Sequence, residues 1–271
     1  GTSSLMKRLS APLLSFALLI PALTHAHDAW ILPSATVLSG KEAWITVDAA
    51  VGNDKFFFNH RPLSLKGLEI TSPDGQKVDG KNLHAGEVRS GFDVHLTQAG
   101  TYRIAVVNNG VMARWKEDGK MKRWFGSAAD YAQKVPASAA ELDVRQRASR
   151  VETSATLGEP GSIAQQKEGI NLVGVTHPND LFAGEKAKFI ITIDGQPAKQ
   201  QSVQIVPEGN RYRNNLDAIE LKTNDKGEFE VTWPQAGRYW LETAGADEKA
   251  TIPAVKKRTL SYSATLEVLP Q

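Results

Sequence analysis

The sequence predicts an all-β protein built from two immunoglobulin-like β-sandwich domains, joined by an elaborated segment with short helices. Short runs that alternate apolar and polar residues, as half-buried strands do, fill most of the chain, and turn signals such as Asp194-Gly195 separate them. The segment at 98–103 (QAGTYR) is echoed at 235–240 (QAGRYW). In each copy a Gly turn leads into a strand with an early Tyr, which is typical of the tyrosine corner of immunoglobulin-like sandwiches. Two such corners predict two sandwiches.

The first 26 residues have the layout of a secretory signal peptide that follows a short upstream extension. Met6-Lys7-Arg8 is a positively charged start, and the stretch from Leu9 to Leu23 is mostly apolar. Small residues precede a cleavage point after Ala26. A membrane-spanning helix needs about 20 apolar residues, and no later segment is apolar enough. The expected product is therefore a secreted chain that begins at His27 and has no membrane span.

Residues 27–108 are expected to form the N-terminal sandwich. Alternating runs predict strands at 43–48, 68–71 and 101–107, and Pro73-Asp74-Gly75 is a turn signal between them.

Residues 109–169 differ in character and are expected to form a connector or insertion. WKEDGK at 115–120 predicts the tip of a hairpin that ends near Trp124. Ser127 is expected to cap a short helix that runs to Lys134 and stops before Pro136. Two further expectations concern a second helical turn, from the capping-box pattern at 138–141, and a strand at 145–157.

Residues 170–271 are expected to form the C-terminal sandwich. Its strands are expected at 170–175, 187–193, 202–206, 229–233 and 239–243.

Charge and cysteine content exclude several classes of function. The chain has 32 basic and 30 acidic residues, and loss of Lys7 and Arg8 with the signal peptide would leave 30 of each. A balanced chain has no overall basic field, so nucleic acid is not an expected partner. The absence of cysteine excludes disulfides, thiolate metal sites and thiol nucleophiles. Any metal site must use nitrogen and oxygen ligands.

Signal cleavage would give His27 two ligand nitrogens, the imidazole and the new α-amine. With one further imidazole, these form a three-nitrogen set suited to copper, and nitrogen ligands also bind nickel, cobalt and zinc. The alternative is that cleavage must leave some residue at the N-terminus, and that a histidine is found there by chance and has no role in metal binding. The other histidines after the cleavage point have neither HxH nor HExxH spacing. His60 follows an aromatic run, His177 lies where a strand ends in a Pro turn, His95 fits a structural place in a strand, and His84 fits a solvated loop.

No catalytic motif stands out, so an enzyme is not expected. The chain has no GxSxG elbow, GxGxxG run or P-loop. The stretch from Arg114 to Trp124 interleaves cations with aromatics, which in a secreted protein indicates a solvated hairpin or a surface for a partner or glycan.

Four segments together resemble the DUF4198 family of secreted bacterial proteins, often described as periplasmic components associated with nickel or cobalt uptake. They are HDAW at 27–30, FNHRPL at 58–63, THPNDL at 176–181 and DKGEF at 225–229. The resemblance implies a β-rich periplasmic accessory protein of a membrane metal importer, and it does not imply an enzyme. It also points to His27, His60 and His177, which lie in the matching segments, as metal ligands.

The favoured hypothesis is therefore a periplasmic protein that captures a divalent transition ion and delivers it to a membrane importer. Nickel or cobalt is favoured by the resemblance, and copper or zinc remains open. One alternative is a non-metal binding or structural module of the cell envelope, with Trp115 and Trp124 as its contact surface. Another is a copper-dependent oxidative enzyme that uses an N-terminal histidine, which would also need an open coordination position and a substrate face.

Overall fold

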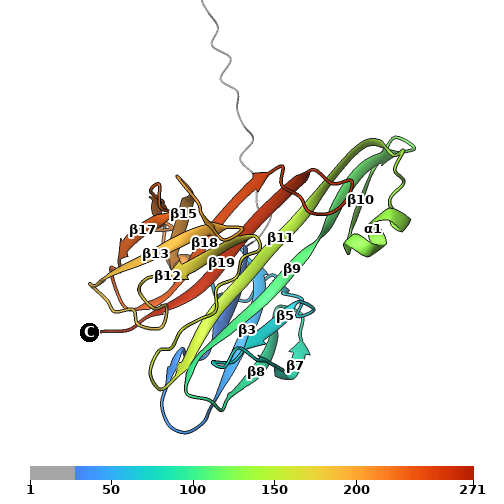
Figure 1. Cartoon of the computed structure of the whole chain (residues 1–271). Helices are drawn as coiled ribbons and strands as arrows, with labels where there is room; N and C mark the ends of the chain where they lie inside the picture. Colours follow the sequence, from blue (N-terminus) through green and yellow to red (C-terminus); the bar gives the residue numbers. More distant parts are fainter. Residues whose placement is uncertain (1–27) are drawn as a thin grey trace, which may run out of the picture.

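The computed structural model describes residues 28–271, so the expected signal segment and His27 lie outside the described residues. The described chain is all-β, as predicted, and its strands form three sheets (Figure 1). The first sheet has the order β1-β3-β8-β7, with β4 paired to β3. Its strands are β1 (Asp28–Pro33), β3 (Ala43–Gly52), β4 (Arg61–Pro62), β7 (Lys81–Ala85) and β8 (Ser90–Leu96).

The central sheet joins strands from both halves of the chain, in the order β16-β15-β18-β19-β11-β9-β5-β6. In addition, β10 pairs with β9 and β2 pairs with β11. The strands are β2 (Val37–Leu38), β5 (Leu68–Thr71), β6 (Lys77–Val78), β9 (Gly100–Glu117), β10 (Lys120–Gly126), β11 (Ala140–Leu157), β15 (Ser202–Pro207), β16 (Ile219–Lys222), β18 (Gly237–Asp247) and β19 (Lys257–Val268).

The third sheet belongs to the C-terminal half. It consists of β12 (Ile170–Gly174), β13 (Lys186–Ile193), β14 (Gln196–Pro197) and β17 (Glu228–Thr232), with β13 paired to the other three. A 3₁₀ turn, Asn210–Tyr212, lies between β15 and β16.

The two sandwiches share the central sheet, because β11 pairs in parallel with β19 from Arg145 opposite Lys257 to Glu152 opposite Ala264. Alternation along β11 directs successive side chains to opposite faces. Val151 packs in the core with the first sheet, whereas Ala148 packs in the core with the third sheet. The first and third sheets therefore cover opposite faces of the central sheet.

Both predicted tyrosine corners are present. The hydroxyl of Tyr102 accepts hydrogen bonds from the backbone N–H groups of Thr97 and Gln98, each at 3.0 Å. The hydroxyl of Tyr239 donates to the carbonyl of Gln235 at 2.7 Å. Both rings are buried, so each corner ties a strand to the turn before it.

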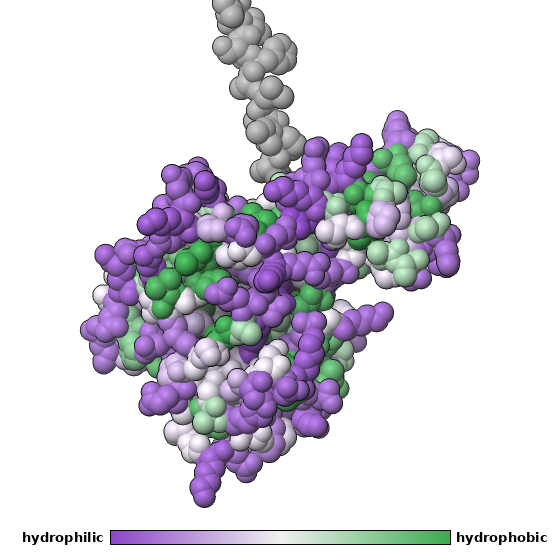
Figure 2. Space-filling model, viewed as in Figure 1, coloured by the Kyte–Doolittle hydropathy of each residue, from purple (hydrophilic) through white to green (hydrophobic). Residues whose placement is uncertain are grey.

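The expected connector is largely part of the central sheet. The boundary expected between residues 108 and 109 falls inside β9, whose pairing with β11 continues without interruption from Gly100 to Arg114. Beyond the body of the protein, the far ends of β9, β10 and β11 form a projecting arm, which Figures 1 and 2 show as a separate lobe. We call this lobe, residues 109–147, the arm.

Helix α1 (Ala128–Lys134) packs on one face of the arm. It begins as predicted, because the Ser127 hydroxyl accepts from the backbone N–H of Asp130 at 3.2 Å. The prediction of a second helical turn near Ser138 is wrong. Residues 137–138 form a turn, β11 begins at Ala140, and Glu141 lies in a bulge with a positive φ of 53°. Strand pairing with β9 therefore replaces the helical turn that the capping pattern indicates.

Within residues 28–271, no helix combines the length and the apolar character that a membrane crossing requires.

Candidate functional site

Strand β1 lies at the edge of the first sheet, against the C-terminal half of the chain. The carbonyl oxygen of Ala29 accepts from the indole N–H of Trp240 at 3.0 Å and from the hydroxyl of Ser263 at 3.2 Å. The carbonyl of Ile31 accepts from the hydroxyl of Thr265 at 2.5 Å. These side chains satisfy edge-strand carbonyls that would otherwise lack partners. The start of β1 is thereby held at the junction of the two sandwiches.

Asp28, the first described residue, forms an ion pair with Lys55. The Lys55 side chain is 5% exposed and that of Asp28 is 23% exposed. The Lys55 ammonium also donates to the carbonyl of Asn53 at 3.1 Å and lies 4.6 Å from the ring centroid of Trp240. A buried cation needs such partners, because its transfer from water is otherwise costly. Asp28 therefore has a structural role.

Trp30 is the second fixed side chain of the HDAW segment. It is fully buried and packs with Trp240, Ala50 and Val206. Its ring lies 6.2 Å from the ring of Phe56 and 6.4 Å from that of Phe58. The aromatic run before His60 thus packs against the start of β1.

His60 lies beside this strand start. Gly52 is the register partner of Asp28, and a Cβ added at Gly52 would lie 3.7 Å from the Cβ of His60. His60 itself is exposed. The structure therefore brings His60 next to the residue that directly follows His27 in the sequence.

Glu242 is a second potential ligand near the start of β1, and the sequence did not single it out. It is the register partner of Ser263, whose hydroxyl binds the carbonyl of Ala29. It also shares a face of β18 with Trp240, the other donor to Ala29. No local pattern could have indicated Glu242, because its proximity to β1 depends on pairing between distant segments.

His177 has a different environment, in which both ring nitrogens have hydrogen-bond partners. Nδ1 accepts from the backbone N–H of Asn179 at 3.0 Å, so the ring proton lies on Nε2. Nε2 lies 2.7 Å from the carbonyl of Gly161, to which it donates, and 3.1 Å from the hydroxyl of Thr101. His177 thus ties the segment after β11 to the loop after β12.

His60 and His177 lie at opposite ends of β1. His177 contacts Thr101, whose hydroxyl lies 2.8 Å from that of Thr156. The backbone of Thr156 in turn binds the carbonyl of Thr36, beyond the C-terminal end of β1. A six-residue strand such as β1 spans about 17 Å, whereas nitrogen ligands lie about 2 Å from a bound ion. One ion cannot be bound by both histidines.

Among the described residues, no group of three or more histidine, aspartate or glutamate side chains is placed to hold a metal ion. His27, the residue on which the expected site depends, is outside this part of the chain.

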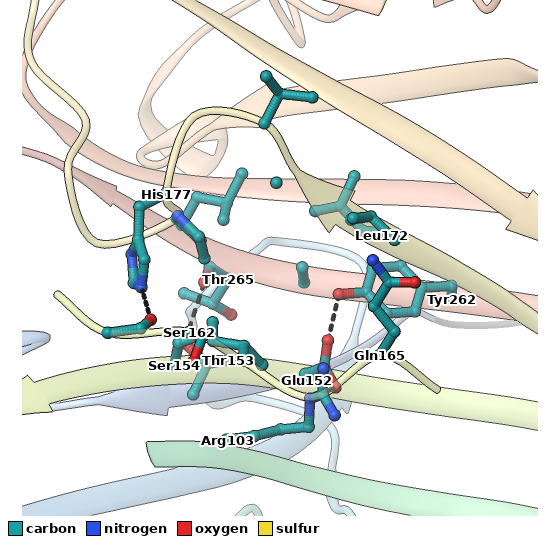
Figure 3. A pocket seen from close by; sticks show the side chains of 18 residues that line it. Arg103, Glu152, Thr153, Ser154, Ser162, Gln165, Leu172, His177, Tyr262 and Thr265 are labelled. Carbon is teal, nitrogen blue, oxygen red and sulfur yellow. Dashed lines mark hydrogen bonds and ion pairs between the residues drawn. The ribbon is translucent and has the colours of Figure 1, made fainter. Parts of the chain in front are cut away.

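A pocket of about 270 Å³ is lined by β11 and β19 of the central sheet, by β12, and by the segment after β11 (Figure 3). His177 lines one end, and Glu152 and Tyr262 line the other. The Glu152 carboxylate accepts from the hydroxyl of Tyr262 at 2.5 Å and lies 3.1 Å from both Arg103 and Arg150. Burial, together with the charge of Glu152, raises the pKa of Tyr262 well above its usual value. This cluster of Arg103, Arg150, Glu152 and Tyr262 stabilises the parallel pairing of β11 with β19, because it links side chains of both strands to β9.

The two tryptophans considered as a contact surface lie toward α1. Trp115 is 8% exposed and belongs to the small core beneath the helix. The ring of Trp124 lies 6.1 Å from that of Tyr131 on α1. The opposite face of the arm is the one that remains open.

The fold and the junction at β1 define a two-sandwich all-β protein whose N-terminal strand is held between the sandwiches. The chain belongs to the DUF4198 family, described as a domain of unknown function, whose sequence model matches residues 24–247. A search of curated proteins finds no match.

Several solved structures show weak similarity. Trypsin-activated alpha-2-macroglobulin from Escherichia coli is 15% identical, with a TM-score of 0.22, over 90% of this chain and 16% of that one. The FN1–FN3 domains of chicken CNTN1 are 6% identical, with a TM-score of 0.24, over 89% and 98% of the two chains. A DUF3823 family protein from Bacteroides uniformis ATCC 8492 is 10% identical, with a TM-score of 0.25, over 90% and 100%. The chain spans about a sixth of the macroglobulin, and scores this low carry no argument about function.

Proposed function

We propose that this protein is a periplasmic metal-binding accessory protein that captures a divalent transition ion at the start of β1 and delivers it to a membrane importer. After cleavage behind Ala26, the α-amine and imidazole of His27 would supply two nitrogen ligands. His60 would supply a third nitrogen, and Glu242 would be a candidate for an oxygen ligand. The protein would act as a binding and delivery protein and not as an enzyme.

The observation that carries this proposal is the place of His60. Asp28 and Gly52 are register partners, and Gly52 lies beside His60. A ligand on the residue directly before Asp28 would therefore be within reach of the loop that carries His60. An imidazole ligand must lie within a few ångströms of the other donors of an ion. The place of His60 beside Gly52 supports it as this third ligand, whereas His177 lies at the other end of β1.

The rigidity of the strand start also supports a site there. The Asp28–Lys55 ion pair, the buried ring of Trp30 and the two hydrogen bonds to Ala29 fix the backbone directly after His27. A metal site gains affinity when its ligands are held in place before the ion binds. The side chains that follow His27 in the HDAW segment would therefore act as supports for the ligands.

The chemistry of the donors limits the ion. Imidazole and amine nitrogens suit nickel, cobalt, copper and zinc, and affinity rises toward copper whatever the biological cargo is. The family resemblance favours nickel or cobalt. The amine and imidazole have ordinary pKa values near 8 and 6.5, so an ion can displace their protons near neutral pH.

The test is calorimetric titration of the chain that begins at His27 with Ni²⁺, Co²⁺, Cu²⁺ and Zn²⁺, beside His60→Ala and His84→Ala. His84 is an exposed histidine on β7, at the edge of the first sheet farthest from β1, and it serves as the matched control. His60→Ala should weaken binding of the cognate ion at least tenfold, while His84→Ala should leave it unchanged. Equal affinity in all three proteins would remove His60 from the site.

A further inference from the structure

The open face of the arm carries arginines in adjacent rows. Arg123 on β10 lies opposite Arg114 on β9, and Arg114 lies opposite Asp143 on β11. In the next row, Phe125 and Arg145 both lie opposite Met112. Side chains of directly paired residues share one face of a sheet. This face is the one that the first sheet covers farther along β9 and β11, and on the arm no described element covers it.

These side chains line a groove of about 730 Å³, which we call the arginine groove. Its lining on this face is Met112, Arg114, Arg123, Phe125, Asp143, Arg145 and Arg147, and the intervening residues Ala113 and Trp124, which pack toward α1, also border it. A second hollow of about 380 Å³ shares Phe125 and Arg147 with the first and adds Lys66. Asp143 is therefore the single acidic side chain among the residues that line the two hollows. In a chain whose charges balance overall after signal cleavage, this is a local excess of positive charge.

The acidic residue does not neutralise the groove. Asp143 is shared between Arg114, at 3.4 Å, and Arg145, at 3.3 Å. The guanidinium groups of Arg123 and Arg147 have no ion pair or hydrogen bond within residues 28–271, although that of Arg147 lies 5.8 Å from the ring centroid of Phe125. Partial burial and the nearby charge of Arg61 lower the pKa of Arg147 from its usual value. An anion in the groove would relieve this repulsion.

Apolar side chains accompany the arginines on the same face. Phe125 is 49% exposed, and Met121, which precedes Arg123 by two residues on β10, is 48% exposed. A soluble anion would not require such side chains. Basic residues combined with exposed large apolar residues are typical of surfaces that lie in the interfacial region of an anionic membrane.

We propose that the arginine groove docks this protein on an anionic phospholipid surface. The guanidinium groups of Arg123 and Arg147 bind lipid phosphates, for which their planar paired N–H donors are well suited. Phe125 and Met121 enter the interface between headgroups and acyl chains. The arm projects from the body, so the groove can reach a membrane without disturbing either sandwich (Figure 1). This inference does not depend on metal binding.

The test is co-sedimentation of the chain that begins at His27 with vesicles of phosphatidylcholine, with and without phosphatidylglycerol. We expect binding only when phosphatidylglycerol is present. The Arg123→Gln/Arg147→Gln variant should bind roughly 25-fold more weakly, since each basic residue near an anionic surface contributes about a fivefold factor. Phe125→Ser/Met121→Ser should also weaken vesicle binding. Because the contribution of these apolar side chains is not electrostatic, the weakening relative to the unchanged protein should change less with salt than that of the arginine variant.

The matched control is Lys199→Gln/Lys222→Gln, which removes the same charge from exposed positions on the C-terminal sandwich. It should retain the binding of the unchanged protein. Equal losses in the control and the arginine variant would show nonspecific attraction and overturn the groove. Absence of binding to phosphatidylglycerol vesicles at physiological salt would also overturn the proposal and would leave an acidic protein as the remaining type of partner. Circular dichroism of each variant verifies that it is folded.

Discussion

The indole N–H of Trp240 donates a hydrogen bond of 3.0 Å to the backbone carbonyl of Ala29, which is 211 residues earlier in the chain. This contact joins the C-terminal half of the central sheet to the edge strand of the first sheet. The ring of Trp240 also lies over the Lys55 ammonium, 4.6 Å from the ring centroid. The position of the start of β1 thus depends on contacts from both halves of the protein. The geometry of the proposed metal site would depend on the same contacts.

The ion pair at the start of β1 predicts a distinctive double-mutant result. Asp28→Asn leaves the buried Lys55 ammonium without its counter-charge, and we expect a loss of about 3 kcal/mol in the free energy of unfolding. Adding Lys55→Met should recover most of this loss, because the unpaired charge is then absent. Urea denaturation of both single variants and the double variant measures the coupling. Additive losses would contradict a direct interaction.

The tyrosine corners should contribute similarly in the two sandwiches. Tyr102→Phe leaves the backbone N–H groups of Thr97 and Gln98 without their acceptor, and Tyr239→Phe removes the donor to Gln235. Each change should lower the free energy of unfolding by about 1–3 kcal/mol. Thermal unfolding of the two variants checks this. A variant as stable as the unchanged protein would show that its corner is not stabilising.

His177 should matter for stability and not for metal affinity. His177→Ala removes the acceptor of Asn179 N–H and the donor to Gly161, so we expect a loss of about 1–3 kcal/mol in the free energy of unfolding. Metal affinity, measured by calorimetry on the same sample, should stay unchanged. A tenfold loss of affinity without a loss of stability would instead restore His177 as a ligand.

The ion pairs of Arg258 should make a pH-dependent contribution to the free energy of unfolding. Its buried guanidinium binds Asp194 and Asp247 and lowers the pKa of both carboxyls below their usual value of 3.8. Groups with a lowered pKa in the folded state stabilise it above their unfolded pKa, and this contribution disappears as the pH falls. The stability difference between the unchanged protein and Arg258→Met should therefore be constant near neutral pH and shrink below about pH 4. Denaturant titrations from pH 7 to pH 3 measure it, and a gap that stays constant at low pH would contradict the ion pairs.

Local patterns in the sequence predicted local structure well. The repeated Gly and Tyr pattern located both corners, because the tyrosine hydroxyl reaches only a few residues back along the chain. The Ser127 cap was found for the same reason, since it requires a single hydrogen bond to Asp130. Strand alternation sufficed to predict an all-β fold.

Long-range pairing could not be predicted from the same patterns. The parallel seam of β11 and β19 joins Arg145 to Lys257, and neither segment signals its partner. For the same reason, the sequence could not show that His60, and not His177, lies near the start of β1, and it could not identify Glu242. The capping pattern at Ser138 failed because pairing with β9 determines the structure there.

In the proposed site, the amine of His27, once it is the first residue, binds the ion together with His60. The most direct measurement compares the metal affinity of the chain that begins at His27 with that of the same chain carrying one additional alanine before it. The alanine converts the His27 nitrogen into an amide and leaves residues 28–271 unchanged. We predict at least a tenfold loss of affinity for the cognate ion. Equal affinity in the two proteins would contradict the claim.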